Sequence, residues 1–178
     1  MNYKKLYLFL FLSLFTLLLR GQVEEYEYKA AYIERFTRFV EWPEAIESLK
    51  FNGIFKIAII GRSPFNESLD DLFSNVKIRN QKVELIYTND INDLIDANLV
   101  FVSSSEKRNI KDILAAINNR PILVISDTKG FGEKGCHINM YVDIDKIKIE
   151  INLEEIEKSN LKASSLLLSS FLIVRTNG

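Results

Sequence analysis

Apolar runs of strand length alternate along the chain with segments that have helical spacing. The runs lie at residues 55–60, 83–87, 99–102 and 122–125. Between them, apolar side chains recur every three or four residues, a spacing typical of amphipathic helices. Strands that are apolar on both faces and alternate with helices indicate a mostly parallel sheet covered by helices on both faces. The expected fold class is therefore α/β.

Capping residues predict where several of these helices begin and end. The first helix, over residues 24–41, should stop at Trp42-Pro43, because a proline disfavours helical geometry in the residue before it. A second helix is expected to begin with Ser63 as N-cap and Pro64 at its first position. A short helix is expected over residues 89–96. A possible capping box from Ser103 to Glu106 precedes a helix that extends to residue 117.

The C-terminal part of the chain has a different pattern. Residues 137–142 and 146–151 alternate around an Asp143-Ile144-Asp145 turn, which predicts an antiparallel β-hairpin on the sheet edge. A final helix is expected to carry Leu161, Leu166, Leu167, Leu168, Phe171, Leu172 and Val174. Because the sequence contains no internal repeat or linker, residues 22–178 are expected to form a single domain.

Residues 1–21 have the pattern of a secretory signal peptide. Two lysines precede an apolar run from Leu6 to Leu19, which is shorter than the ~20 apolar residues of a membrane span. We expect cleavage between Gly21 and Gln22 and export, with an uncleaved N-terminal anchor as the alternative. Of the 23 basic side chains, the 3 in this segment would be lost and none of the 24 acidic ones, so the mature domain would be acidic.

The composition excludes several kinds of site. The chain has one His and one Cys, too few for a His/Cys zinc site or an internal disulfide, and we expect no metal and no cofactor. Its net charge of −1 gives no electrostatic reason to expect nucleic acid as a partner.

The carboxyl ends of the predicted strands carry the candidate binding residues. In open α/β sheets, ligands bind in the crevice beyond these ends. The residues there are Arg62, Ser63, Ser103, Ser104, Ser105 and Asp127. Two of these segments are expected to run into helix N-termini, which favour anions, and Arg62 would suit a carboxylate or phosphate. The alternative is that Ser63 and Ser103 only cap helices and Asp127 only makes a turn.

Other apparent motifs do not predict catalysis. Residues 130–135 match G-x-G-x-x-G, but they run into a strand rather than a helix, so we expect a flexible loop. Cys136 and His137 are adjacent in a strand, so their side chains should point to opposite faces. The acidic residues on helices form no pair that suggests acid–base chemistry. We therefore expect no enzyme.

Short motifs follow one another in order along almost the whole of residues 22–178. They are KAAY (29–32), FVEWP (39–43), IGRSPF (60–65), VSSSE (102–106), ISD (125–127) with Gly130-Phe131, GCHINM (135–140), EINL (150–153), Leu161-Lys162, Ser164-Ser165 and Leu167-Leu168. As an ordered set they resemble the YfiR/HmsC-like family of exported bacterial regulatory proteins.

The resemblance implies a periplasmic regulator that is not an enzyme. Such proteins bind the periplasmic sensor domain of an inner-membrane diguanylate cyclase and hold the cyclase inactive, which lowers cyclic-di-GMP and biofilm formation. A sensor kinase is the alternative partner, and a homodimer is expected. The second hypothesis is a sensory module that binds a small anion or metabolite in the crevice around Arg62 and Ser103.

Cys136 bears on the redox control that some members of this family exert through paired cysteines. With only one cysteine, this chain cannot form an intramolecular disulfide switch. We expect His137 to take the outward face of the strand and Cys136 to be buried as an unreactive thiol.

Overall fold

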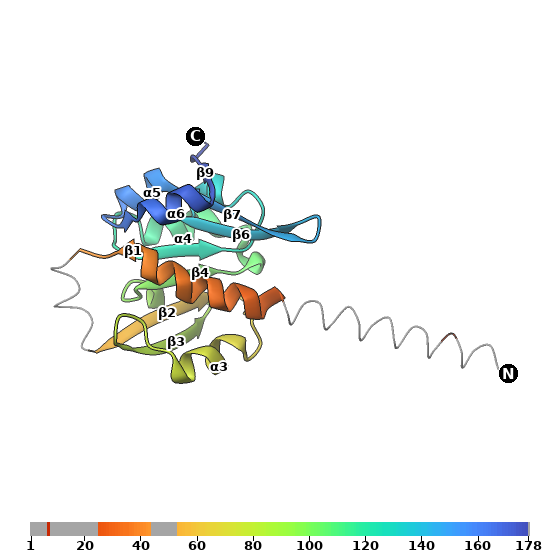
Figure 1. The fold of residues 1–178 in the computed structure, drawn as a ribbon, viewed down its shortest axis with the longest axis vertical. Coiled ribbons are helices and arrows are strands. Elements are labelled where there is room, and N and C mark those ends of the chain that lie inside the picture. Colours follow the sequence, from red (N-terminus) through yellow and green to blue (C-terminus); the bar gives the residue numbers. More distant parts are fainter. Residues whose placement is uncertain (1–6, 8–24, 44–52, 178) are drawn as a thin grey trace.

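The computed structural model describes residue 7 and residues 25–43 and 53–177 (Figure 1). The strands are β1 (Val40–Glu41), β2 (Ile54–Ile60), β3 (Lys82–Thr88), β4 (Leu99–Val102), β5 (Leu123–Ser126), β6 (Ile138–Asp143), β7 (Lys146–Asn152), β8 (Lys162–Ala163) and β9 (Leu172–Val174). The helices are an N-terminal helix (25–39), α3 (Ser68–Asn75), α4 (Ile110–Ala116), α5 (Leu153–Lys158) and α6 (Ser165–Ser170), with short 3-10 helices η1 (Ile91–Leu94), η2 (Ser104–Glu106) and η3 (Gly132–Lys134).

Seven of the strands form one sheet in the order β3-β2-β4-β5-β6-β7-β9. The pairs from β3 to β6 are parallel, β6 and β7 are antiparallel, and β9 runs parallel to β7. The predicted α/β class with a mostly parallel sheet is confirmed. Strands β1 and β8 form a separate antiparallel pair.

Both faces of the sheet are covered, because successive strand residues point to opposite sides. In β2, Phe55, Ile57 and Ile59 belong to one apolar cluster, which also contains residues of the N-terminal helix, α3 and α6. Ala58 and Ile60 belong to a second cluster with residues of η1 and α4. In Figure 1 the N-terminal helix crosses over the middle strands of the sheet.

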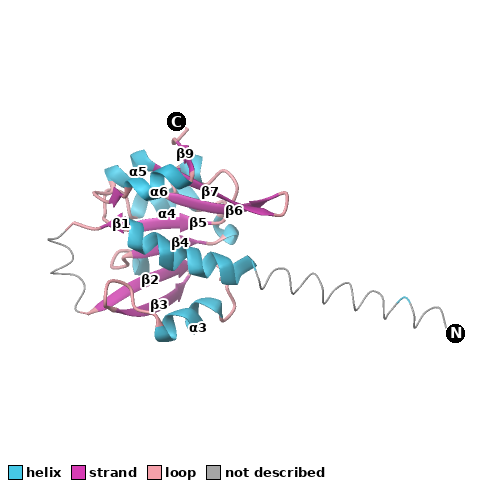
Figure 2. Ribbon diagram, viewed as in Figure 1, coloured by secondary structure: helices cyan, strands magenta, loops and turns pink. Residues whose placement is uncertain are grey.

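The predicted hairpin is present, and its turn has a defined geometry. Asp143 and Lys146 are paired, so the turn consists of Ile144 and Asp145, whose φ angles are +47° and +59°. Positive φ at both central residues is the mark of a type I′ turn, which matches the twist of the flanking strands. Figure 2 shows the hairpin extending beyond the rest of the sheet. It does not form the edge, however, because β9 lies outside β7.

The predicted final helix is present only in part, as α6 with Leu166, Leu167 and Leu168, because the segment divides into three short elements. Ala163 pairs with Val40 in the β1–β8 ladder. Ser164 then caps α6 by accepting a hydrogen bond from the backbone N–H of Leu167. Phe171 is extended, and β9 follows it against β7. Pairing with distant strands therefore overrides the helical spacing of the leucines.

The helix start predicted at Ser63 and the capping box predicted at Ser103 are also wrong. Helix α3 begins at Ser68, while the Ser63 hydroxyl accepts a hydrogen bond from the backbone of Phe65 in a local turn. Ser103 is the N-cap of η2 but forms no side-chain capping bond. Ser63 precedes a bend and Ser103 precedes a 3-10 helix, and the sequence pattern distinguishes neither from the N-terminus of an α-helix.

The glycine-rich segment is packed rather than a flexible loop. Phe131 is buried in the second apolar cluster. Gly132 lies so close to β7 that a Cβ there would be 2.9 Å from Glu150 Oε2. The buried phenylalanine and the neighbouring carboxylate account for the packing.

The expected signal peptide and its cleavage site lie outside the described residues. Among the helices that the structure describes, none has the length and apolar character needed to cross a membrane.

Candidate functional site

The ends of β2 and β4 form a topological switch point. These strands are neighbours, yet α3 follows β2 on one face and α4 follows β4 on the other, as their buried residues show. Open α/β sheets bind ligands at such points, where successive connections diverge to opposite faces. We call the region formed by residues 61–63 and 103–105 the β2–β4 crevice.

Five of the six predicted site residues belong to this crevice. The backbone N–H of Arg62 donates a 3.0 Å hydrogen bond to Ser105 Oγ, which links its two sides. Arg62 and Ser104 are exposed, whereas Ser103 is buried. The Ser103 hydroxyl is a buried group for which the described residues provide no hydrogen-bond partner.

Glu106 lies beside this crevice, although the sequence pattern does not mark it as a site residue. Its carboxylate accepts hydrogen bonds from Ser105 Oγ at 3.0 Å and from Asn109 Nδ2 at 2.9 Å. Gly61 has a φ of +90°, and a Cβ there would lie 2.7 Å from Glu106 Oε1. Gly61 therefore allows both the left-handed backbone and the close approach of the acid. An anion entering the crevice would meet this carboxylate.

Asp127, the sixth predicted residue, is engaged with the N-terminal helix. Its Oδ2 accepts a 2.7 Å hydrogen bond from the hydroxyl of Tyr26 and lies 3.5 Å from Nζ of Lys29. The Lys29 and Asp127 side chains are each 2% exposed. Lys29 Nζ also lies 2.5 Å from Glu25 and 4.4 Å from the centre of the Tyr26 ring. Asp127 thus holds the helix to the end of β5.

One sequence signal points to this ion pair. Ala30, Ile33 and Phe36 form the buried stripe of the N-terminal helix, and Lys29 stands four residues before Ile33, where the same stripe continues. A lysine in an apolar stripe needs a buried partner. The sequence does not show which carboxylate provides that partner, because Asp127 lies far away along the chain.

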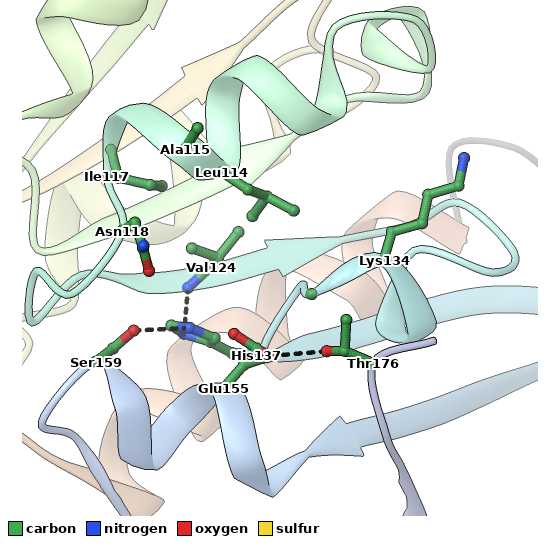
Figure 3. A pocket seen from close by; sticks show the side chains of 11 residues that line it. Leu114, Ala115, Ile117, Asn118, Val124, Lys134, His137, Glu155, Ser159 and Thr176 are labelled. Atoms are coloured by element: carbon green, nitrogen blue, oxygen red, sulfur yellow. Dashed lines mark hydrogen bonds between the residues drawn. The ribbon is translucent and has the colours of Figure 1, made fainter. Parts of the chain in front are cut away.

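His137 is buried, contrary to the expectation that it would face outward. Its Nδ1 accepts a 3.1 Å hydrogen bond from the backbone N–H of Val124, and its Nε2 lies 3.1 Å from Ser159 Oγ (Figure 3). Desolvation by burial lowers the pKa of His137 to about 3, so the imidazole is neutral near pH 7. Since Nδ1 is an acceptor, Nε2 carries the proton and donates it to Ser159. His137 therefore does not act as a base towards this serine, as a nucleophilic Ser–His pair would require.

The predicted burial of Cys136 is confirmed. Its side chain has no exposed surface and belongs to the second apolar cluster. Burial raises the pKa of the Cys136 thiol to about 12, although a hydrogen bond with Ser126 and the charge of Lys134 act in the opposite direction. The thiol is therefore protonated at neutral pH. In the part of the chain that the structure describes, no group of three His, Cys, Asp or Glu side chains could hold a metal ion.

The strand order and the two helical layers define an α/β domain with a mostly parallel, doubly covered sheet. The sequence of this domain matches the YfiR/HmsC-like family over residues 26–170, and the chain belongs to that family. Membership of the family suggests a periplasmic regulator of cyclic-di-GMP signalling.

Solved structures with a similar fold have little sequence identity to this chain. The ABC domain from Streptococcus pneumonia in complex with L-Trp has a TM-score of 0.52 and 9% identity, and the match covers 74% of this chain and 58% of that one. A conserved domain protein from Vibrio cholerae has a TM-score of 0.51 and 11% identity, and the match covers 72% of this chain and 57% of that one. The chain thus spans less than two thirds of each, and the likeness shows the fold alone. A search of curated proteins by sequence finds no significant match.

Replacing Lys29 should destabilise the domain strongly. In Lys29→Met the Asp127 carboxylate keeps the hydrogen bond from Tyr26 but loses its buried cation. Breaking a buried ion pair in this way costs about 3–5 kcal/mol of unfolding free energy. Urea unfolding measures this loss. Lys158→Met is the control, because Lys158 makes its ion pairs with Glu154 and Glu155 at the surface, where solvent screens them. Equal losses in the two variants would contradict the structural role of the buried pair.

Cys136 should not react in the folded protein. At pH 8 the thiol of the native chain should resist iodoacetamide, because a protonated thiol without exposed surface offers no accessible thiolate. Labelling should become complete in urea, as mass spectrometry can show. Rapid labelling of the native chain, or an oxidised dimer band that Cys136→Ser abolishes, would mean that the thiol is accessible.

Proposed function

We propose that this chain is a non-enzymatic periplasmic regulator that acts through protein contacts. In this proposal it binds the periplasmic sensor domain of an inner-membrane diguanylate cyclase and lowers cyclic-di-GMP and biofilm formation. Family membership supports the signalling system. The direction of proton donation between His137 and Ser159 supports a role without catalysis, since the one histidine of the chain does not activate this serine.

The observation that carries the proposal is an apolar surface at the C-terminal edge of the sheet. Leu166 of α6 is 58% exposed, and Leu172 and Ile173 of β9 are 63% and 45% exposed. Leu172 and Ile173 are adjacent on β9 and point to opposite faces of the sheet, so exposed apolar groups flank this edge on both faces. We call these three residues the C-terminal apolar surface. The sequence contains no charged side chain between Lys162 and Arg175. Exposed apolar groups on a strand at the end of a sheet mark an interaction site.

The opposite edge of the sheet gives a useful contrast. Strand β3 forms that edge, and its exposed residues include Lys82 and Glu84. Charged side chains on an edge strand discourage pairing with another chain. Because β9 lacks such charges, it is the edge better suited to a protein partner. A second copy of this chain is the alternative occupant, and native mass spectrometry of the purified complex distinguishes the two.

Leu172→Lys should prevent binding of the membrane partner. The tagged mature chain should recover a cyclase from solubilised membranes, and Leu172→Lys should recover at least about tenfold less, because a charge would be placed in the apolar contact. Ile144→Lys is the matched control, since Ile144 is 89% exposed in the hairpin turn, outside the C-terminal apolar surface. Recovery of a sensor kinase would mean that the kinase, and not the cyclase, is the partner. Recovery of neither, or equal recovery by both variants, would contradict the proposal.

The second candidate is a small-molecule sensor that uses the β2–β4 crevice. Its position at the switch point and the unpartnered hydroxyl of Ser103 favour a ligand there. The Glu106 carboxylate favours a ligand that offers a donor to this acid over a simple anion. Asp127 would contribute only after releasing Lys29 and Tyr26.

Thermal shifts measured with nucleotides, amino acids and organic acids would test the crevice. A ligand present at 100 times its dissociation constant adds ~2.7 kcal/mol to the unfolding free energy. Arg62→Ala should reduce any such shift, while Arg38→Ala should not, because exposed Arg38 pairs with Glu34 on the N-terminal helix. If Arg62→Ala leaves every observed shift unchanged, the site is not in this crevice.

A further inference from the structure

A cavity of about 210 Å³ lies at the other end of the sheet from Asp127. Val124, the second residue of β5, lies in its wall, whereas Asp127 follows the end of that strand. Leu114 and Ile117 of α4 contribute apolar side chains, and Thr176 contributes from the segment after β9. Figure 3 shows Leu114 and Ile117 on one side of this space and His137 on the other. This cavity includes no residue of the β2–β4 crevice or of the C-terminal apolar surface.

The hydrogen bonds of His137 determine what the cavity wall offers to a ligand. Nδ1 accepts the backbone N–H of Val124, which excludes a proton on Nδ1 and therefore excludes both the cation and the other neutral tautomer. The proton on Nε2 must then be donated to Ser159 Oγ. Ser159 accepts this bond with its oxygen and keeps its own hydroxyl proton.

The Ser159 hydroxyl proton has no acceptor among the contacts of the described residues. The Ser159 side chain lines the cavity and is 7% exposed. A buried donor without an acceptor costs free energy that a bound acceptor would recover. The cavity wall therefore presents the unused donor of Ser159 opposite an apolar surface, and the exposed Asn118 contributes an amide to the same lining.

The charged groups around the cavity are already engaged. Glu155 Oε1 accepts from Lys158 Nζ at 2.9 Å and from Thr176 Oγ1 at 2.8 Å. Lys134 Nζ lies 5.0 Å from the centre of the Phe131 ring. A charged ligand would thus face a carboxylate or a cation that already has a partner. An uncharged ligand meets no such conflict.

We propose that this cavity binds a small uncharged molecule that combines a carbonyl or amide oxygen with an apolar body. The oxygen accepts the hydrogen bond of the Ser159 hydroxyl, and the apolar body packs against Leu114 and Ile117. The volume of about 210 Å³ is smaller than the roughly 300–1,000 Å³ of sites that hold drug-sized ligands. The ligand therefore has few non-hydrogen atoms. This activity goes beyond the proposed regulation and does not depend on it.

The single histidine makes a direct test possible. Long-range ¹H–¹⁵N spectra of the labelled mature chain contain one imidazole, which should have the Nε2–H tautomer at pH 7. Titration with 2-pyrrolidone, an uncharged cyclic amide, should shift the His137 resonances saturably. Pyrrolidinium, a cation with a similar ring and no carbonyl, should not. Saturable binding of both probes alike would overturn the proposal, because the carbonyl oxygen would then not be what the cavity recognises. Binding of neither probe would also overturn it, and the cavity would then hold water only.

Two variants locate the binding. Ser159→Ala should weaken 2-pyrrolidone about tenfold through loss of one hydrogen bond, while Ser169→Ala, at an exposed position on α6, should bind as the parent does. Leu114→Phe should reduce binding by filling the cavity and should preserve the Nε2–H tautomer, so the test stands even if Ser159→Ala does not fold. Unchanged binding in Leu114→Phe, or in a folded Ser159→Ala, would show that 2-pyrrolidone binds elsewhere. Arg62→Ala and Leu172→Lys should leave this binding unchanged, which separates it from the other two sites.

Discussion

Strands β2, β4 and β5 are buried on both faces, and this constraint determines where polar chemistry can occur. Every residue of β4 and β5 is buried, so helices must cover both sides of the sheet. Along these strands, polar side chains are then left to the ends, as in the β2–β4 crevice. Further along the sheet, buried Asn139 is hydrogen-bonded to Ser126 and Glu150. The cavity beside His137 lies between α4 and α5, and the C-terminal apolar surface lies at the edge of the sheet.

The same constraint explains the unusual position of Lys29. The N-terminal helix must bury an apolar stripe against the sheet, yet Lys29 lies within that stripe with almost no exposed surface. The side chain is accommodated because Asp127, at the end of β5, provides a buried carboxylate. A buried pair of this kind contributes little net stability but fixes position, because any shift of the helix would leave a charge without its partner.

The sequence predicts the central strands well, because an apolar run of four to seven residues has few alternatives in a covered sheet. The prediction from sequence fails where pairing with a distant strand determines the local structure. The leucines after residue 160 have helical spacing, but Ala163 pairs with β1 and Ile173 pairs with β7. The position of the crevice follows from a general rule about strand ends. The partners of Asp127 and His137 cannot be predicted in this way. Lys29 lies 98 positions from Asp127, Ser159 lies 22 positions from His137, and nothing in the local pattern connects either pair.

The β1–β8 ladder has a consequence for the order of folding. Val40 pairs with Ala163, so the end of the N-terminal helix is fixed by residues near the C-terminus. Contacts between such distant positions require closing a long loop, and folding slows as they become more numerous. The apolar face of this helix therefore cannot complete its packing until residues 162–163 are in place. The helix is thus secured only after a strand far downstream of it has formed.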